Sequence, residues 1–239
     1  MVSFALISLF SWVVLGQNEM ASTQDFALEF RLGPYRPQVD KAFPSGQGPY
    51  AQVFGKKHML LSEVELDWQF FHGFGSLGLG VASGYAGING KSLIEDAASG
   101  ELSFSPKTTS LKLIPIKLLL VWRMDILANR LDIPFVPYVK GGFMLNRWWS
   151  TKAGKTSVAR EEYGKEKASG WRSGYLGILG LAVQLDAFDR QLAKDLDTSM
   201  GINHSYLFAE YAFERVQSFG KKGPNLSSNH WMFGLAFEF

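Results

Sequence analysis

The chain has 239 residues, a formal net charge of +2 and no cysteine. The near balance of acidic and basic residues gives no overall electrostatic footprint for nucleic acid. Without cysteine the chain has no disulfide, thiolate metal site or cysteine nucleophile. Aromatic residues make up 14% of the chain and glycine occupies 25 positions, a combination that favours closely packed β-structure over helical bundles.

The N-terminus is an apolar run from Val2 to Leu15. This run is shorter than the roughly 20 residues that a membrane-spanning helix needs. It matches the core of a signal peptide, with Val14 and Gly16 in the small-residue positions before the cut. We therefore predict a signal peptide over 1–16, a periplasmic segment over 17–25 and a barrel domain over 26–239. Because no Lys or Arg precedes the run, a start further upstream, or a buried strand or helix, stays open.

Period-two alternation of large apolar residues begins directly after this leader. Residues 25–33 place Phe and Leu side chains on one side of an extended chain and small or charged ones on the other. Residues 62–71 and 75–84 repeat the pattern, and the short link from His72 to Gly75 predicts a hairpin between them.

Further along, the same alternation recurs in residues 116–125, 138–148, 173–186, 205–214 and 230–239. Because proline cannot donate to a strand ladder, we expect regular pairing to end at Pro115. The chain is therefore predicted to contain eight strands.

The links between these strands differ in length in an ordered way. Every other link is long and polar, at residues 41–57, 86–109, 151–171 and 215–229. Of the remaining links, 72–75 and 126–137 are shorter, and 186–203 has the apolar spacing of a short amphipathic helix. Long loops at one end and tight turns at the other are typical of barrels in bacterial outer membranes.

Alternation alone does not say which face of each strand lies inside the barrel. A soluble ligand-binding barrel puts its apolar face in the lumen, whereas a membrane barrel turns it to lipid. Eight strands enclose an interior just wide enough for side chains, so small and charged residues fit inside and large aromatics outside. We therefore predict a lumen charge network of Glu29, Arg31, Glu63, Glu65, Asp67, Lys117, Arg123, Asp125, Lys140 and Glu210.

Aromatic residues gather at the predicted strand ends and at the C-terminus. Such residues form girdles at the two membrane interfaces, and here we assign Trp68, Trp122, Trp148, Trp149 and Trp171 to them. The last strand ends in an aromatic residue, which resembles the signal that the barrel-assembly machinery reads in outer-membrane proteins. Its residues are Trp231, Phe233, Leu235, Phe237 and Phe239.

Three stretches resemble an uncharacterised family of outer-membrane β-barrel proteins from myxobacteria and related Gram-negative bacteria. They are residues 121–142, 180–202 and 203–211, so the resemblance covers mainly the second half of the chain. It implies residence in the outer membrane and about eight strands. It implies no catalytic residues.

The histidines are candidates for the catalytic residues of a barrel enzyme. Barrel enzymes acting on lipid A or on peptides need a His with a Ser or Asp partner near the outer rim. His204 and Ser205 are adjacent but lie at the predicted periplasmic end, while His58 and His230 lie near the outer rim. These positions are better explained if the histidines are polar residues at the membrane interface without a catalytic role. We therefore assign no catalytic residue.

Three other motifs suggest a binding or catalytic site but are better explained as loops or as ion pairs inside the barrel. Residues 84–92 end in Gly-Lys-Ser, but no helix pattern follows as a phosphate loop requires, so a loop is expected there. The carboxylates Glu63, Glu65 and Asp67 are expected to pair with lumen cations rather than to form a catalytic dyad or a metal site. The charged loop over 151–171 offers Lys and Arg to lipopolysaccharide phosphates.

The sequence therefore predicts an all-β protein, an eight-stranded antiparallel up-and-down transmembrane barrel with a short periplasmic helical connection. We expect it in the outer membrane, with a structural, adhesive or small-channel role and outer loops as the recognition surface. The alternative is an outer-membrane barrel enzyme acting on lipid A or peptides. Expected partners are outer-membrane lipid, lipopolysaccharide and the barrel-assembly machinery during insertion, with no nucleic acid, cofactor or metal.

Overall fold

The computed structural model describes residues 25–43, 48–95, 102–131, 133–152, 155–156, 168–188, 191, 198–220 and 223–239. In this part of the chain the strands are β1 (Phe26–Tyr35), β2 (Met59–Gly73), β3 (Gly75–Glu95), β4 (Leu102–Arg123), β5 (Phe135–Lys152), β6 (Lys155–Thr156), β7 (Ser169–Gln184), β8 (His204–Arg215) and β9 (Ser228–Glu238). The short helices are η1 (Val39–Ala42), α1 (Pro49–Phe54), α2 (Ile126–Leu131), η3 (Leu185–Ala187) and η4 (Ser218–Gly220). The predicted signal peptide lies outside the described residues.

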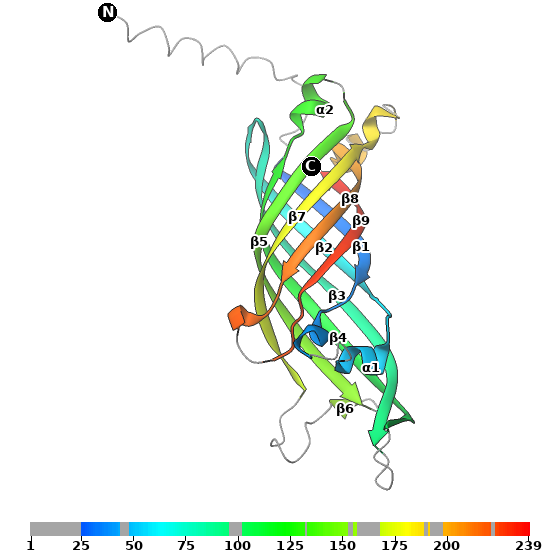
Figure 1. Ribbon diagram of the computed structural model, residues 1–239. Coiled ribbons are helices and arrows are strands. Elements are labelled where there is room, and N and C mark those ends of the chain that lie inside the picture. The colour runs from blue at the N-terminus through cyan, green and yellow to red at the C-terminus, as the bar shows by residue number, and fades with distance from the viewer. Residues whose placement is uncertain are drawn as a thin grey trace, which may run out of the picture.

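The strands form one closed antiparallel barrel (Figure 1). Each long strand pairs with its neighbours along the chain, and β6 is a two-residue extension paired with the end of β5. The barrel closes between the first and last strands, where Ala27 to Leu32 pair with Glu238 to Phe233. The prediction of an eight-stranded up-and-down barrel is thus confirmed.

The two ends of the barrel differ. One end, here called the terminal end, carries the C-terminus, α2 and the tight turn between β2 and β3 (Figure 1). The opposite loop end carries η1, α1, η4 and the ends of β3 and β4. The long links thus lie at one end of the barrel and the shorter links at the other, as predicted. The start of β1 and the end of β9 lie at the terminal end.

At the loop end the structure differs from the predicted loop over 86–109. β3 and β4 continue as a paired ribbon there, with Ile88 opposite Leu111 and Gly90 opposite Thr109. The Gly-Lys-Ser stretch expected in a loop therefore lies in strand β3. The prediction was wrong because Asn89 and Gly90, a pair that commonly forms a turn, lie within the ribbon opposite Ser110 and Thr109, and the strand ladder continues past them.

Pro115 was expected to end pairing, yet it lies inside β4. The register between β3 and β4 passes from Ser83 opposite Ile116 to Ala86 opposite Leu113, so the missing N–H is accommodated locally. The Ser83 hydroxyl donates to the Pro115 carbonyl oxygen at 3.2 Å. On its other side Pro115 pairs with Asn146, which keeps the ladder continuous.

Two of the links also form structure that was not predicted. The link over 41–57 folds into η1 and α1 instead of a polar loop, and the link over 126–137 contains α2. The expected amphipathic helix over 186–203 begins with the short helix η3, and residues 189–190 and 192–197 of this segment lie outside the described residues. Within the part of the chain that is described, no helix is long and apolar enough to cross a membrane.

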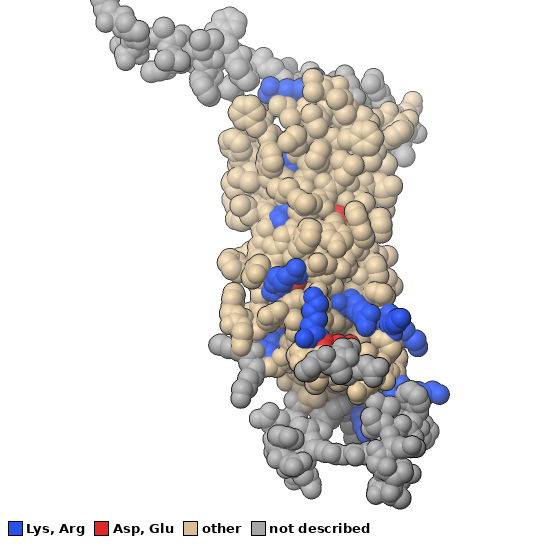
Figure 2. Space-filling view, viewed as in Figure 1, with Lys and Arg blue, Asp and Glu red and all other residues tan. Residues whose placement is uncertain are grey.

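Large apolar side chains cover the outside of the barrel. One row runs across neighbouring strands through Val81, Leu118, Phe143 and Tyr175, which are 55–67% exposed to solvent. Figure 2 shows this surface as a tall, nearly uncharged band, with Lys and Arg gathered beyond it towards the loop end. An apolar surface of this extent is far larger than soluble monomers expose, so the band is the surface that faces lipid.

A charge placed in this band tests its contact with lipid. Replacing Leu118, in the band on β4, by Arg should lower the free energy of unfolding in lipid vesicles by about 2–4 kcal/mol. The same substitution at Leu60, at the loop end of β2, should cost only about 0–1 kcal/mol, since the interface hydrates the guanidinium. Urea titrations followed by tryptophan fluorescence would measure both values. Equal costs at the two positions would contradict the assignment.

Candidate functional site

The inward faces of β1 and β2 carry charges at every second residue. Glu29 and Arg31 on β1 lie beside Glu63, Glu65 and Asp67 on β2, and all five are at most 3% exposed. The strand period of two produces this row, because the alternate residues are the apolar ones that face lipid. The lumen therefore contains a dense row of charge that water barely reaches.

Arg31 is the centre of this row. Its Nη1 donates to Glu210 Oε1 on β8 at 2.7 Å, and its Nε lies 3.5 Å from Glu63 Oε2. Its Nη2 also contacts the carboxylate of Glu65, and Nη1 lies 3.9 Å from Glu29. One guanidinium thus links three strands across the lumen.

Three further cations complete the network from the opposite wall. Lys117 Nζ on β4 lies 2.7 Å from Glu63 and 2.8 Å from Glu214. Lys140 Nζ on β5 lies 2.5 Å from Glu29 and 2.7 Å from Glu65. Arg123 on β4 contacts both Glu29 and Asp67.

Neutral side chains donate further hydrogen bonds to the buried carboxylates. The Tyr138 hydroxyl donates to Glu210 at 2.9 Å. Near the terminal end, Glu238 accepts hydrogen bonds from Gln69 at 2.9 Å and from the Tyr206 hydroxyl at 2.8 Å. Buried carboxylates need such partners, because an unpaired buried charge is strongly destabilising.

The network as a whole contains more acid than base. Among the described residues, the buried acids are Glu29, Glu63, Glu65, Asp67, Glu210, Glu214 and Glu238, and the buried bases are Arg31, Lys117, Arg123, Lys140 and Arg172. Glu29, Glu65 and Asp67 approach one another closely enough to hold a metal ion. Arg31, Arg123 and Lys140 already contact these carboxylates, so side-chain cations supply the compensating charge.

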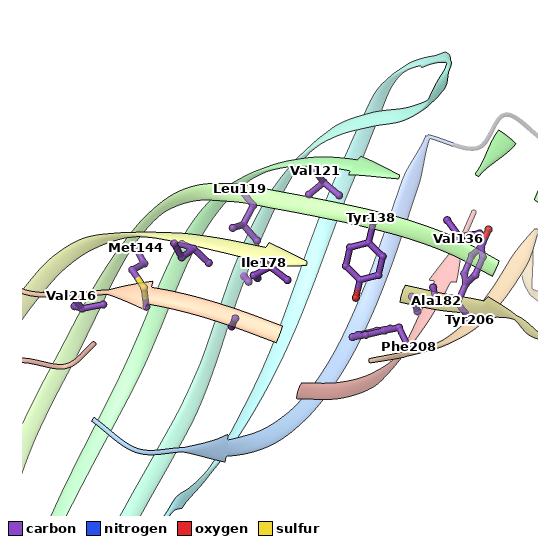
Figure 3. Packing of buried hydrophobic residues seen from close by; sticks show 14 of the residues in the cluster. Leu119, Val121, Val136, Tyr138, Met144, Ile178, Ala182, Tyr206, Phe208 and Val216 are labelled. Carbon is purple, nitrogen blue, oxygen red and sulfur yellow. The ribbon is translucent and has the colours of Figure 1, made fainter. Parts of the chain in front are cut away.

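Apolar side chains fill much of the rest of the lumen. Leu119, Tyr138 and Ile178, from β4, β5 and β7, project to the inside of the barrel with Phe208 from β8 (Figure 3). The Tyr138 and Phe208 rings meet edge to face with their centroids 6.2 Å apart. The interior thus combines a charge network centred on β1 and β2, which Lys140 from β5 and Glu210 from β8 join, with apolar side chains from β4, β5, β7 and β8 that pack beside it.

At the loop end the first link folds inwards and narrows the lumen. The Asp40 carboxylate accepts hydrogen bonds from the backbone N–H groups of Tyr50 and Ala51, at 2.9 and 3.0 Å, and so caps α1. Tyr50 and Phe54 are buried against Tyr35 and other inward residues of the barrel. Burial raises the pKa of the Tyr50 phenol to about 12.

The structure brings nine of the ten predicted network residues into the lumen. Asp125 is the exception, because it lies in the turn after β4. There it accepts a hydrogen bond from Ser76, and burial raises its pKa. The prediction extended the strand two residues too far. Glu214 and Glu238, which also carry the alternation, belong to the network instead of Asp125.

Four of the five predicted interfacial tryptophans lie on the outside of the barrel, and one lies inside it. Trp68 and Trp122 are exposed at the terminal end, and Trp171 is exposed on β7 towards the loop end, with Arg147 stacked 5.5 Å from its ring. Trp149 is half-buried on the outward face of β5. Trp148 differs from the prediction, because it packs against both buried clusters inside the barrel. In a strand, adjacent residues face opposite sides, so only one of this pair can face lipid.

On the final strand the predicted assembly signal shares one face. Trp231, Phe233 and Leu235 are exposed outside the barrel, and Phe237 and Phe239 are half-buried there. The backbone of Phe239 also closes the barrel seam, since its N–H and C=O both pair with Phe26.

The histidines lie in unrelated environments. His58 is exposed beyond α1, whereas His230 is buried on the inward face of β9 against the Tyr35 ring. The described part of the chain gives neither ring a hydrogen-bonded Ser or carboxylate. His204 contacts Asp186 at 2.6 Å at the terminal end. Although burial opposes ionisation, hydrogen bonds from His204 and Gln184 lower the pKa of Asp186.

Comparison with known proteins gives structural likeness only. The chain matches no protein-family model and no curated protein sequence. The attachment invasion locus protein Ail of Yersinia pestis, solved with the heparin analogue sucrose octasulfate, matches with 10% identity, a TM-score of 0.43 and coverage of 90% of this chain and 97% of Ail.

Two other solved structures are similar to a comparable degree. Outer membrane protein OprG of Pseudomonas aeruginosa shares 13% identity, with a TM-score of 0.43 and coverage of 92% and 97%. Outer membrane protease OmpT of Escherichia coli shares 8% identity, with a TM-score of 0.36 and coverage of 90% and 94%. The assignment of this chain as a membrane barrel depends on its own strand pairing and exposed band.

Removal of the central cation tests the lumen network. Replacing Arg31 by Met should destabilise the barrel by about 3–5 kcal/mol, because several buried carboxylates lose their shared partner. The matched control is Lys112→Met, which removes a half-buried cation on the outward side of β4 and should change stability by about 0.5 kcal/mol or less. Denaturant unfolding in detergent micelles measures both. A loss below about 1 kcal/mol for Arg31→Met would count against the network.

Proposed function

We propose that the chain is an outer-membrane β-barrel with a structural or interaction role, held in the bilayer by its apolar band. Its lumen is closed, and its loop end faces the outside of the cell as the recognition surface. The terminal end faces the periplasm. The short turns, the start of β1 and the end of β9 then lie on the periplasmic side, and short turns on that side are usual for such barrels.

The observation that carries this proposal is the inversion of the barrel. Large apolar side chains such as Leu118 and Phe143 cover its outside, while Arg31, Lys117 and their carboxylates lie inside with at most 3% exposure. Hydrocarbon favours such an outside, and a closed ladder satisfies the backbone within it. A soluble barrel of the same topology would have the reverse distribution.

Closure of the lumen argues against a diffusion pore. Arg31, Lys117 and Lys140 join the walls through contacts of 2.5–2.7 Å to carboxylates, and α1 packs at the loop end. Eight-stranded barrels have room for little beyond their side chains. The excess of buried acid means that any small conductance should favour cations.

The proposal also covers how the barrel is inserted and which proteins it is related to. The outward row from Trp231 to Phe239 supports recognition by the barrel-assembly machinery during insertion. We also propose that the chain is related to the uncharacterised myxobacterial outer-membrane family that residues 121–142 and 180–211 resemble.

Expression in a Gram-negative host tests location and orientation together. The protein should fractionate with the outer membrane and migrate faster in detergent gels before boiling than after it. Protease added to intact cells should cut at the loop end, between β5 and β7, and leave the terminal end intact. Recovery in the periplasmic fraction after osmotic shock would instead indicate a soluble barrel.

The closed lumen has a direct electrical consequence. The refolded protein should give no stable conductance steps in a planar lipid bilayer. The double variant Arg31→Ser/Glu65→Ser removes one charge of each sign from the centre of the network and should produce brief openings that favour cations. Large, stable channels from the unaltered protein would contradict the closed lumen.

A further inference from the structure

A cavity of about 490 Å³ lies at the loop end between η1 and the link that joins β8 to β9. Its lining includes Gln38 and Lys41 from the first link and Arg215, Gln217 and Asn225 from the last. The function proposed above makes no use of it. Its volume is within the range of sites for small molecules.

Hydrogen bonds between the two links hold the walls of this cavity in place. The backbone N–H of Gln38 donates to the Ser227 carbonyl at 2.9 Å. The Tyr35 hydroxyl donates to the Leu226 carbonyl, and Leu226 N–H donates to the Val216 carbonyl at 3.0 Å. The cavity therefore lies between two segments that hydrogen bonds hold together. Tyr35, Leu226 and Ser227, which make these bonds, are buried.

The polar groups that line the cavity are mainly donors. Both hydrogen bonds that Arg215 makes among the described residues come from Nη1, to the Glu214 carbonyl and to Asn229, which leaves Nη2 and Nε as donors. The side-chain oxygen of Asn225 accepts from Ser227 N–H at 3.0 Å, which leaves its NH₂ group as a donor. Together with Lys41 these groups form a site for an anion.

Among the described residues no carboxylate lines the cavity, and two acids of the neighbouring segments have partners elsewhere. Asp40 caps α1 through both carboxylate oxygens. Glu214 turns into the lumen, where it contacts Lys117 at 2.8 Å. A third cation, Arg172, lies directly behind the wall, since a Cβ on Gly223 would overlap its guanidinium. Lys41 and Arg215 thus line the cavity, and the Arg172 guanidinium lies next to Gly223 of its wall.

Its position along the barrel indicates the kind of anion. On the outward face of β8, Tyr211 and Phe213 are followed by Arg215, so the lipid-facing row changes there from apolar to cationic. Tyr211 also contacts Phe213 and Trp231, with ring centroids 4.7 and 5.0 Å apart. Aromatic clusters of this kind mark the membrane interface. The cavity therefore opens at the level of lipid headgroups.

We propose that this cavity binds the phosphate-bearing sugar headgroup of an outer-leaflet glycolipid. Lys41 and Arg215 contact the phosphate, the side-chain amides of Gln217 and Asn225 hydrogen-bond to the sugar, and the acyl chains lie on the aromatic cluster of Tyr211, Phe213 and Trp231. The inference depends on the proposed function, because only the outer leaflet of an outer membrane presents this lipid to the loop end.

Binding of a defined lipid tests the site. The full barrel is reconstituted in phosphatidylcholine nanodiscs and titrated with bis-phosphorylated lipid A, with dephosphorylated lipid A and with inorganic phosphate. Lipid A should bind, and removal of its phosphates should weaken binding at least tenfold. Inorganic phosphate alone should bind far more weakly, because it makes no contact with the aromatic cluster.

Variants locate the binding site. Lys41→Gln and Arg215→Gln should each weaken lipid A binding about tenfold, since each removes one charge-assisted contact. Lys41→Arg should retain binding, and Lys56→Gln, which removes an exposed cation beyond α1 and outside the cavity, should leave it unchanged. Heat-modifiable migration of each variant shows that its barrel is folded.

The outcomes separate the two proposals. Folded variants that bind lipid A like the unaltered protein would overturn the glycolipid site and leave the barrel assignment intact. Phosphate binding as strong as that of lipid A, with the same dependence on Lys41, would replace the glycolipid with a free anion and also overturn it. Failure of the unaltered protein to insert or to show heat-modifiable migration would overturn the proposed function and the glycolipid site with it.

Discussion

The constraint on which this structure depends is that backbone polar groups in hydrocarbon must be paired within the protein. A sheet meets that requirement only when it has no edge, so the seam between β1 and β9 completes the fold. The seam runs from Phe26, paired with Phe239 at 3.0–3.1 Å, to Leu32 opposite Phe233. The aromatic C-terminus is therefore both the end of the lipid-facing row and part of the closure.

Closure with eight strands determines what the lumen can hold. The interior is narrow, so residues on the inward face must fill it and also satisfy one another. Here a charge network centred on Arg31 lies beside apolar side chains that include Leu119 and Ile178, and α1 packs at the loop end. Replacing the charges with apolar residues could be equally stable, but an apolar inward face would remove the difference between the two faces that fixes strand register.

Much of this architecture could be predicted from the sequence, because period-two alternation determines both the strands and their faces. The apolar/charged contrast identified Glu29, Arg31 and Lys140 as inward residues, and the structure places them there. Alternation could not show that Trp148 faces inwards, because Trp148 and Trp149 are both aromatic. It also could not reveal α1 or the cavity beside Arg215. The cavity depends on contacts between the first and last links, more than 170 residues apart, and α1 depends on packing against inward residues of the barrel. Local sequence patterns carry no information about such contacts.

The central claim is that alternate residues of each strand face lipid and the lumen. Because the chain has no cysteine, single cysteines can be placed at residues 118–121 of β4 and spin-labelled in lipid vesicles. Labels at 118 and 120 should be accessible to oxygen dissolved in the bilayer and shielded from a water-soluble nickel chelate. Labels at 119 and 121 should be shielded from both. Oxygen accessibility at 119 and 121 instead, or chelate accessibility at 118 and 120, would contradict the account.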